Sequence, residues 1–225
     1  MDMVQIGLFI LILIIPAIAQ ALVTSRYKKY SDVENTPKLS GFEVARKILD
    51  ANGLGNIDIV ATSGMLSDHY DPSRKVVRLS QSNFNDCSVA AMAVAAHECG
   101  HAIQHKEGYF MMKVRSFIVP FVNIGTKLSW IIILIGVIAQ LLELIYLGIG
   151  LTALGLLFQL ITLPVEFDAS KRAGIQLNTL GLVEKSDASG VKKVLTAAAM
   201  TYVAGVLTSI LQIIKLVLLF SGRRD

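Results

Sequence analysis

Three long apolar tracts alternate with more polar stretches along this chain of 225 residues. The first tract, residues 3–23, is apolar except for two glutamines, and its 21 residues can cross a hydrocarbon core about 30 Å thick. The second tract, residues 128–165, contains only one charge, Glu143, and its 38 residues are too many for a single crossing. The third tract, residues 194–220, is also long enough to span a membrane.

The middle tract is predicted to fold as a hairpin of two membrane spans that turns near Glu143–Gly148. Glu143 would then lie at the far membrane interface, where a charge is tolerated. Lys215, near the end of the last tract, is expected to extend toward the nearer interface. Residues 117–124 are apolar but too few to span, so they are expected to lie at the interface. The pattern therefore predicts a mainly α-helical membrane protein with about four transmembrane helices.

Charges beside the tracts predict how the chain is oriented. No Lys or Arg precedes the first tract, whereas Arg26, Lys28 and Lys29 follow it. This pattern favours an uncleaved anchor over a signal peptide, with the N-terminus outside and residue 24 onward in the cytoplasm. The two polar stretches, residues 24–127 and 166–193, are both rich in Lys and Arg, which assigns both to the cytoplasmic side.

The first polar stretch contains short helix and strand patterns. Ser40 precedes Glu43 by three residues, the spacing of a capping box, and Asn52–Gly53 would end the helix that it begins. Residues 56–62 and 75–79 read as strands, with residues 67–72 as a loop between them. The free edge of the second strand could pair with an extended peptide.

A further helix is predicted from residue 87, because the run to residue 96 is rich in Ala and Val and lacks Gly and Pro. Asn83, Asn85 and Asp86 are candidate N-caps for it. The helix continues into His97-Glu98-Cys99-Gly100-His101, which reads H-E-x-x-H. Residues four apart share a helix face, so both imidazoles could bind one Zn²⁺. Glu98 stands where a general base for a metal-activated water is needed.

A catalytic zinc usually takes three protein ligands, so a third ligand is expected. A third His after a Gly turn would fall near position 107, which is Glu107. His105 would lie about 12 Å along the helix axis from His97, too far to share the ion easily. Glu166 is the better candidate. A hairpin of two membrane spans over residues 128–165 would return the chain to the membrane face that it left, which is the face of the H-E-x-x-H helix. Asp168 is the competing carboxylate, or a support for a ligand.

Composition narrows the choice of function. Hydrophobic residues make up 53% of the chain and the formal net charge is only +4, with no dense basic tract that would indicate nucleic-acid binding. Cys87 and Cys99 are too far apart on a helix to pair and are expected to be reduced, with Cys99 pointing away from the ligand face. His69, Tyr70 and Arg172 could each stabilise the oxyanion that forms when water attacks a peptide carbonyl. A structural role is favoured for each of the three.

Two stretches, 65–105 and 163–173, resemble the YugP-like bacterial membrane zinc metallopeptidases, which share H-E-x-x-H with the gluzincin membrane proteases of the HtpX and Ste24 groups. The resemblance implies a zincin-like α+β domain in the cytoplasmic region, zinc ligands at His97, His101 and Glu166, and a base at Glu98. The chain departs from the HtpX-like pattern at one position: Ser170 stands where an Asp would follow the ligand Glu by four residues.

The sequence therefore predicts a membrane-embedded zinc endopeptidase, with one Zn²⁺ per chain, that cleaves protein or peptide substrates, membrane proteins among them, at the cytoplasmic membrane face. Its predicted parts are an anchor at 3–23, a catalytic region at 24–127, a hairpin at 128–165, a segment with the third ligand at 166–193 and a last helix at 194–220. One alternative is a non-catalytic scaffold stabilised by zinc, which would not need Glu98. A transporter or an unrelated metal hydrolase are further alternatives, and a transporter would need more polar pairs in the spans than Glu143 and Lys215.

Overall fold

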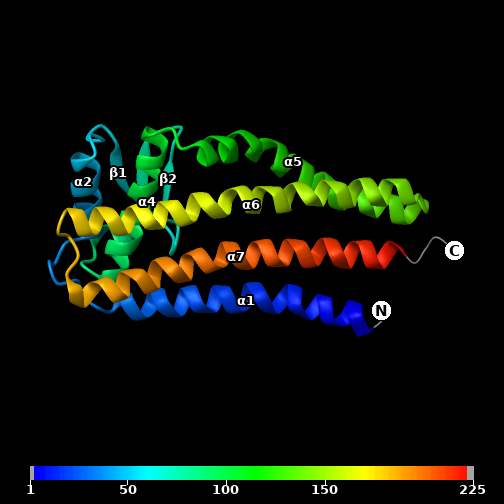
Figure 1. Ribbon diagram of the computed structural model, residues 1–225, viewed down its shortest axis with the longest axis horizontal. Coiled ribbons are helices and arrows are strands. Elements are labelled where there is room, and N and C mark those ends of the chain that lie inside the picture. The colour runs from blue at the N-terminus through cyan, green and yellow to red at the C-terminus, as the bar shows by residue number, and fades with distance from the viewer. Residues whose placement is uncertain (1–2, 222–225) are drawn as a thin grey trace. The chain divides into compact units, whose positions relative to one another are not determined.

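A computed structural model describes residues 3–221 and is mainly helical, with one small sheet (Figure 1). In chain order, the elements are α1 (Met3–Ser31), α2 (Gly41–Ala51), β1 (Asp58–Thr62), β2 (His69–Asp71), β3 (Val76–Ser80), α3 (Gln81–Asn85), α4 (Val89–Lys106), α5 (Phe110–Ala139), α6 (Leu142–Thr179) and α7 (Lys185–Ser221). By length and composition, α1, α5, α6 and α7 could each cross a membrane, as the apolar tracts predict. The predicted class of a mainly helical membrane protein with about four spans is confirmed at this level.

Internal contacts divide the described chain into two compact units. The first unit comprises residues 3–20, 113–164 and 201–221, which hold most of the apolar tracts. The second unit comprises residues 21–112 and 165–200, and therefore holds the sheet, α2, α3, α4, the C-terminal part of α6 and the N-terminal part of α7.

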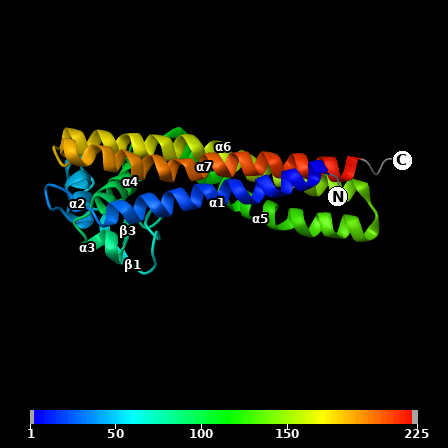
Figure 2. The same cartoon turned by 90° about the horizontal axis from the view of Figure 1, so that it is seen from below.

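In the first unit, α5 and α6 form the predicted hairpin, which Figure 2 shows turning between the two helices. The turn comes earlier than predicted, at Gln140 and Leu141 rather than Glu143–Gly148. Gln140 adopts a positive φ of 58°, and the Leu141 amide donates to Gly136 O over 2.9 Å, which closes the end of α5. Glu143 is exposed in the first turn of α6, where the helix dipole favours a carboxylate.

One further expectation for the apolar tracts is corrected. Residues 117–124 are not a separate interfacial segment, because α5 runs unbroken from Phe110 and includes Pro120. An apolar helix tolerates such a proline where neighbouring groups satisfy the backbone that it frees. The ammonium of Lys215 lies 4.6 Å from the centre of the Phe9 ring, a cation–π contact between α7 and α1, and its expected extension toward a membrane interface stays a prediction.

In the second unit, α2 begins and ends where predicted. The Ser40 hydroxyl accepts from the Glu43 amide while the Glu43 carboxylate accepts from the Ser40 amide, so both halves of the capping box are present. Val44 and Ile48 of α2 are fully buried in the apolar core of this unit, which α4 also lines. Small alanine side chains on α4 let the two helices pack closely, and Ala90, Ala93 and Ala96 are all buried there.

The sheet has the order β1-β3-β2, with β1 parallel and β2 antiparallel to β3. Both predicted strands are present, but the predicted loop at 67–72 contains β2, in which the buried Tyr70 pairs with Val77. Since β3 is the central strand, the expectation of a free edge on the strand before the H-E-x-x-H helix is wrong. The edges of this sheet belong to β1 and β2.

The N-cap of α4 also differs from the prediction. Ser88 caps the helix, with its hydroxyl accepting from the Ala91 amide over 3.0 Å. The predicted caps Asn83 and Asn85 are instead part of the short helix α3, which Asp86 ends. The short helix α3 therefore lies between β3 and α4, and Ser88, directly before Val89, is the N-cap of α4.

Candidate metal centre

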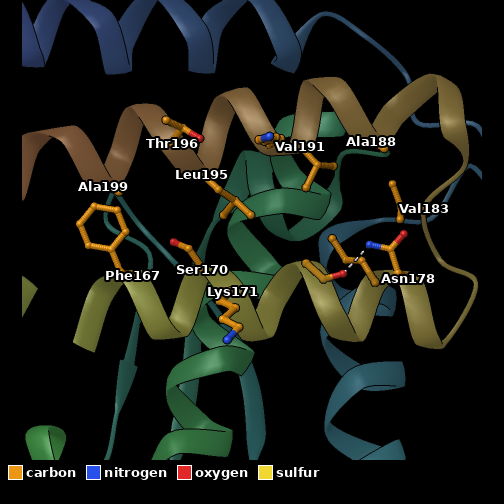
Figure 3. Close-up of a pocket in the computed structure, with 13 residues that line it drawn as sticks. Phe167, Ser170, Lys171, Asn178, Val183, Ala188, Val191, Leu195, Thr196 and Ala199 are labelled. Atoms are coloured by element: carbon orange, nitrogen blue, oxygen red, sulfur yellow. Dashed lines mark hydrogen bonds between the residues drawn. The ribbon is translucent and has the colours of Figure 1, made fainter. Parts of the chain in front are cut away.

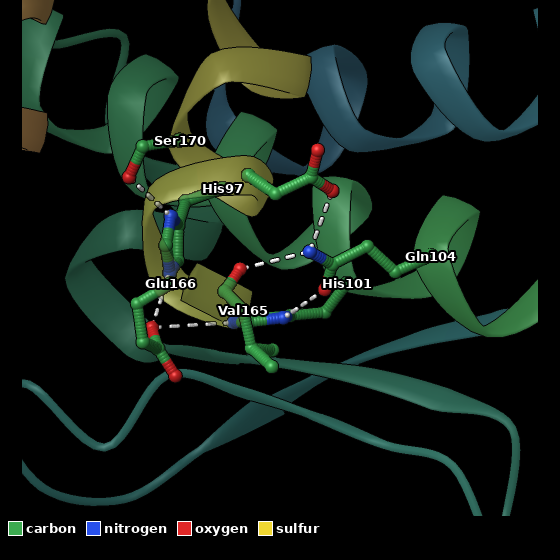
Figure 4. Close-up of polar contacts among 7 residues, drawn as sticks. His97, His101, Gln104, Val165, Glu166 and Ser170 are labelled. Carbon is green, nitrogen blue, oxygen red and sulfur yellow. Dashed lines mark hydrogen bonds and ion pairs between the residues drawn. The ribbon is translucent and has the colours of Figure 1, made fainter. Parts of the chain in front are cut away.

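His97 and His101 lie on one face of α4, and Glu166 comes from α6. Figure 4 shows the three side chains turned toward one another. One potential ligand atom from each lies within 4.8 Å of the others. The side chains are largely shielded from solvent, with exposed fractions of 14%, 10% and 3%. Asp168 and His105 do not belong to this group, so of the candidates weighed for a third position the structure brings Glu166 to the two histidines.

The distances from Glu166 to the two histidines match those between ligand atoms of a tetrahedral metal ion. Glu166 Oε2 lies 3.3 Å from His97 Nε2 and 3.5 Å from His101 Nε2. Zinc bonds to nitrogen and carboxylate oxygen are about 2.0–2.2 Å, so two ligand atoms of a tetrahedron lie about 3.4 Å apart. Two imidazoles and one carboxylate with this separation therefore fit one Zn²⁺ and leave one position for another ligand.

Gly100 lets α6 approach α4 closely enough to form this group. A Cβ atom added at Gly100 would lie only 2.5 Å from the carbonyl oxygen of Ala169, which no ordinary side chain permits. Ala169 is fully buried and sits one helical turn after Glu166. The glycine inside the motif therefore fixes the position of the turn that carries Glu166 and Ser170.

A chain of polar contacts orients His101. Gln104 Nε2 donates to Val165 O and to Asp168 Oδ2, both over 2.8 Å, so its Oε1 is left to accept from His101 Nδ1, 2.9 Å away (Figure 4). His101 consequently carries a proton on Nδ1, and its other ring nitrogen, Nε2, faces Glu166. Arg172 extends the chain, because its Nε donates to the same Asp168 oxygen over 2.5 Å.

His97 is oriented by Ser170. The Ser170 hydroxyl lies 3.2 Å from His97 Nδ1, on the ring edge opposite to the one that faces Glu166. The resemblance to the HtpX-like pattern left carboxylate support from this position in doubt, and here a hydroxyl makes the contact. Each histidine thus has its Nδ1 engaged by a neighbour and its Nε2 directed at the shared carboxylate.

Glu98 is buried beside these groups, with 7% of its surface exposed. Burial raises the pKa of its carboxyl, the nearby imidazoles of His97 and His101 lower it, and the net shift is upward. For His101, burial lowers the pKa of the imidazole, but the hydrogen bond to Glu166 and the charge of Glu98 raise it more. At this site the carboxylates and imidazoles therefore shift one another's pKa values, as is common at functional sites.

The remaining candidates contact groups other than the three potential ligands. Tyr70 makes a hydrogen bond with His105 Nδ1 over 2.8 Å, and His69 Nδ1 contacts the Ser67 carbonyl. Arg172 pairs with Asp168 and with Glu107. The fully buried Cys99 thiol faces Ala45 O across a 3.6 Å contact, as expected for a side chain on the other face of α4.

Gln104 is the residue of this site that sequence reasoning missed. It lies three positions after His101, a spacing that places two side chains on one helix face, so the signal was present. Its partners Val165 and Asp168 lie more than 60 residues away in sequence and gave no such signal.

Comparisons with known proteins agree on one relationship. Residues 5–221 match the model of a family described as "Putative neutral zinc metallopeptidase". The chain is also 44% identical over 207 residues to the "Putative membrane protease YugP" of Bacillus subtilis (strain 168), which covers 92% of each chain. No solved structure matches.

Proposed function

The chain belongs to the YugP-like family of membrane zinc metallopeptidases, and from this premise we propose that it is a zinc-dependent endopeptidase embedded in the cell membrane. The observation that carries the proposal is the convergence of His97, His101 and Glu166, in which both Nε2 atoms lie at the distance from Glu166 Oε2 that two ligands of one zinc ion would have. These three residues would hold one Zn²⁺ per chain, within a zincin-like cytoplasmic domain that carries the H-E-x-x-H helix.

The side chains around the ion have separate tasks. His97 and His101 would contribute neutral imidazoles, and Ser170 and Gln104 contact their Nδ1 atoms. Glu166 contributes the negative charge. When bound, zinc would supply a Lewis acid that brings the pKa of a coordinated water close to neutrality.

Glu98 is proposed as the general base. It follows the first ligand directly on α4 and is buried in the same cluster of charges. In the proposed reaction, Glu98 takes a proton from the attacking water as the water adds to the peptide carbonyl. As the C–N bond breaks, Glu98 passes that proton to the departing nitrogen, so that the products leave as a carboxylic acid and an amine.

The family and the nearby apolar helices suggest the class of substrate. Protein and peptide substrates, including segments of membrane proteins, are proposed, and nucleic acid is not. The residues at 24–127 and 166–193 are proposed to face the cytoplasm, with membrane segments at 3–23, 128–165 and 194–220.

Cleavage and zinc content measured together test this function. The full chain is purified in detergent and assayed on casein and on a fluorogenic peptide, alongside three variants. Glu98→Gln should keep zinc and lose at least about 100-fold in kcat. Glu166→Ala should lose zinc, and Glu184→Gln, an exposed carboxylate of the second unit, should match the wild type. Unchanged cleavage by Glu98→Gln would contradict the mechanism, and zinc without any wild-type cleavage would favour the scaffold alternative.

The proposed orientation has its own test. Met65 is 69% exposed in the loop between β1 and β2, so Met65→Cys places a reactive thiol in the proposed cytoplasmic region. A membrane-impermeant maleimide should label this variant in inside-out vesicles and not in right-side-out vesicles, beyond the wild-type background from Cys87 and Cys99. The reverse pattern would place the site on the outer face.

A further inference from the structure

The carboxylate of Asp168 joins two side chains that come from different helices. Its Oδ2 accepts one hydrogen bond from Gln104 Nε2 over 2.8 Å and another from Arg172 Nε over 2.5 Å. Gln104 is fully buried, whereas the side chains of Asp168 and Arg172 are 25% and 21% exposed. These contacts therefore connect the edge of the second unit to the imidazole of His101, whose Nδ1 lies 2.9 Å from Gln104 Oε1.

The side-chain amide of Gln104 has two possible orientations, and they have opposite consequences for His101. In the orientation described, Nε2 donates to Asp168 Oδ2 and Val165 O, and Oε1 accepts from His101 Nδ1. In the reversed orientation, Oε1 would meet two oxygen atoms at 2.8 Å, and Nε2 would donate to His101 Nδ1. A neutral His101 would then carry its proton on Nε2, the nitrogen that faces Glu166, and could not offer that nitrogen to a metal ion.

Asp168 favours the first orientation because it carries a charge. A hydrogen bond to an ionised acceptor is roughly twice as strong as one between neutral groups, and a carboxylate repels an amide oxygen. Arg172 holds this carboxylate in place. Its Nε donates to Asp168, while its Nη1 donates to Glu107 Oε2 over 2.6 Å at the C-terminal end of α4. The acceptor that orders the amide is therefore itself fixed between α4 and α6.

We propose that Asp168 is a positioning residue for the metal site. Through the amide of Gln104 it keeps the proton of His101 on Nδ1, which leaves Nε2 free for the ion. We call these three residues the relay. The inference rests on the proposed function only in naming zinc as the ion. Metal-ligating histidines usually donate directly to a carboxylate, a backbone carbonyl or water. Here an uncharged amide separates the carboxylate from the ring, so Asp168 sets the position of the proton without accepting it.

Exchanging the amide and the carboxylate tests the relay. Asp168→Asn should weaken zinc binding about tenfold, because the charge that orders the amide is lost. Gln104→Glu should have a similar effect, because two carboxylates would face each other across 2.8 Å. The double variant should bind zinc within about threefold of the wild type, since the carboxylate at position 104 could accept from His101 and from the new amide at position 168. Competition with a chelator on the purified full chain measures all four affinities.

A second readout needs no metal. The four histidines of the full chain are labelled with heavy nitrogen, and zinc is removed with a chelator. At alkaline pH, where the imidazoles are neutral, the magnetic resonance shifts of the two ring nitrogens report which one carries the proton. His101 should be protonated on Nδ1 in the wild type, and Asp168→Ala should give a mixture of both tautomers. The signal that disappears in His101→Asn assigns the residue.

Two controls match the relay residues. Asp50 forms an ion pair of the same spacing with Arg46 on α2, over 2.8 Å, so Asp50→Asn should change neither zinc binding nor the tautomer. Lys171 lies next to Arg172 and lines the pocket between α6 and α7 (Figure 3). No hydrogen bond or ion pair joins Lys171 to Asp168 within the described residues. Lys171→Gln should therefore be neutral, whereas Arg172→Gln should weaken zinc binding about threefold.

Two results would overturn the proposal. Zinc affinity and Nδ1 protonation like those of the wild type in both Asp168 variants would show that packing alone orders the amide. A double variant that binds zinc no better than the weaker single variant would show that Asp168 and Gln104 do not act through each other. A wild type that binds zinc and shows the expected tautomer, with recovery in the double variant but no peptide cleavage, would support the relay and contradict the proposed peptidase.

Discussion

The two units of this chain bury their apolar side chains in opposite ways. In the second unit, Ile48, Leu49 and Leu79 are fully buried around α4, as in a water-soluble domain. In the first unit, Leu134 is 59% and Ile138 is 75% exposed on α5, although both belong to a helix apolar enough to cross a membrane. The first unit therefore presents an apolar outer surface of the kind that a bilayer covers, whereas the second has an internal core that can hold polar side chains in fixed positions.

This difference explains why the candidate metal centre lies in the second unit. A metal site needs ligands held in fixed directions by packing and by further hydrogen bonds. Here α4 supplies two imidazoles from a closely packed core, and Gln104 and Asp168 fix one of them through buried contacts. The α6 helix takes part in both units and contributes Glu166 just after its apolar part ends.

The largest expected effect compares one isoleucine in each unit. Ile48→Ala should lower the free energy of unfolding of the second unit by about 2–5 kcal/mol, because it leaves a cavity in a packed core. Ile138→Ala should change stability by less than about 0.5 kcal/mol, because that side chain faces outward. Denaturant titration in detergent measures both, and similar losses in the two variants would contradict the division into a core unit and a unit with an apolar outer surface.

A pair of glycines gives the next effect. Gly100→Ala should cost about 1–3 kcal/mol and release zinc, because its Cβ would press on Ala169 O and move α6 away from α4. Gly150→Ala meets no atoms and should be neutral or slightly stabilising. Thermal melting and zinc retention after dialysis separate the two variants. A Gly100→Ala protein with full zinc content would show that close helix contact is not required.

Gln104→Leu should weaken zinc binding about 10- to 100-fold while leaving the ligand set intact, because His101 loses the acceptor for its Nδ1 proton. Gln81→Leu, at an exposed position of α3, serves as the control. Competition with a zinc chelator gives the two affinities. Equal affinities would mean that packing alone orients His101.

Ser170→Ala should have the smallest effect, a loss of less than about tenfold in zinc affinity, since it removes one neutral contact of 3.2 Å to His97. The same chelator competition measures it, with Ser67→Ala in the loop before β2 as the control. A larger loss than in Gln104→Leu would show that His97 depends on its partner more than His101 does.

The parts of the structure that local sequence patterns determine could be predicted. The capping box at Ser40, the four apolar helices and the shared face of His97 and His101 all depend on residues a few positions apart. Glu166 was proposed from topology, because a hairpin returns the chain to the same side, and the structure brings it to the two histidines.

Features decided by distant partners could not be predicted. Residues 67–72 have the local pattern of a loop, because the three residues of β2 form a strand only by pairing with β3. The same pairing leaves β3 without a free edge. The turn at Gln140 needs a positive φ that its sequence did not indicate. The role of Gln104 depends on Val165 and Asp168, which reach it only through the approach of α6 at Gly100.

X-ray absorption at the zinc edge, on the purified full chain and on Glu166→Ala, tests the central claim most directly. The account predicts one zinc per chain, bound by two imidazole nitrogens and by oxygen, with no sulfur neighbour. It also predicts that Glu166→Ala loses the ion. A sulfur ligand from Cys87 or Cys99, or full zinc retention with an unchanged spectrum in Glu166→Ala, would contradict the assignment of His97, His101 and Glu166 as the ligands.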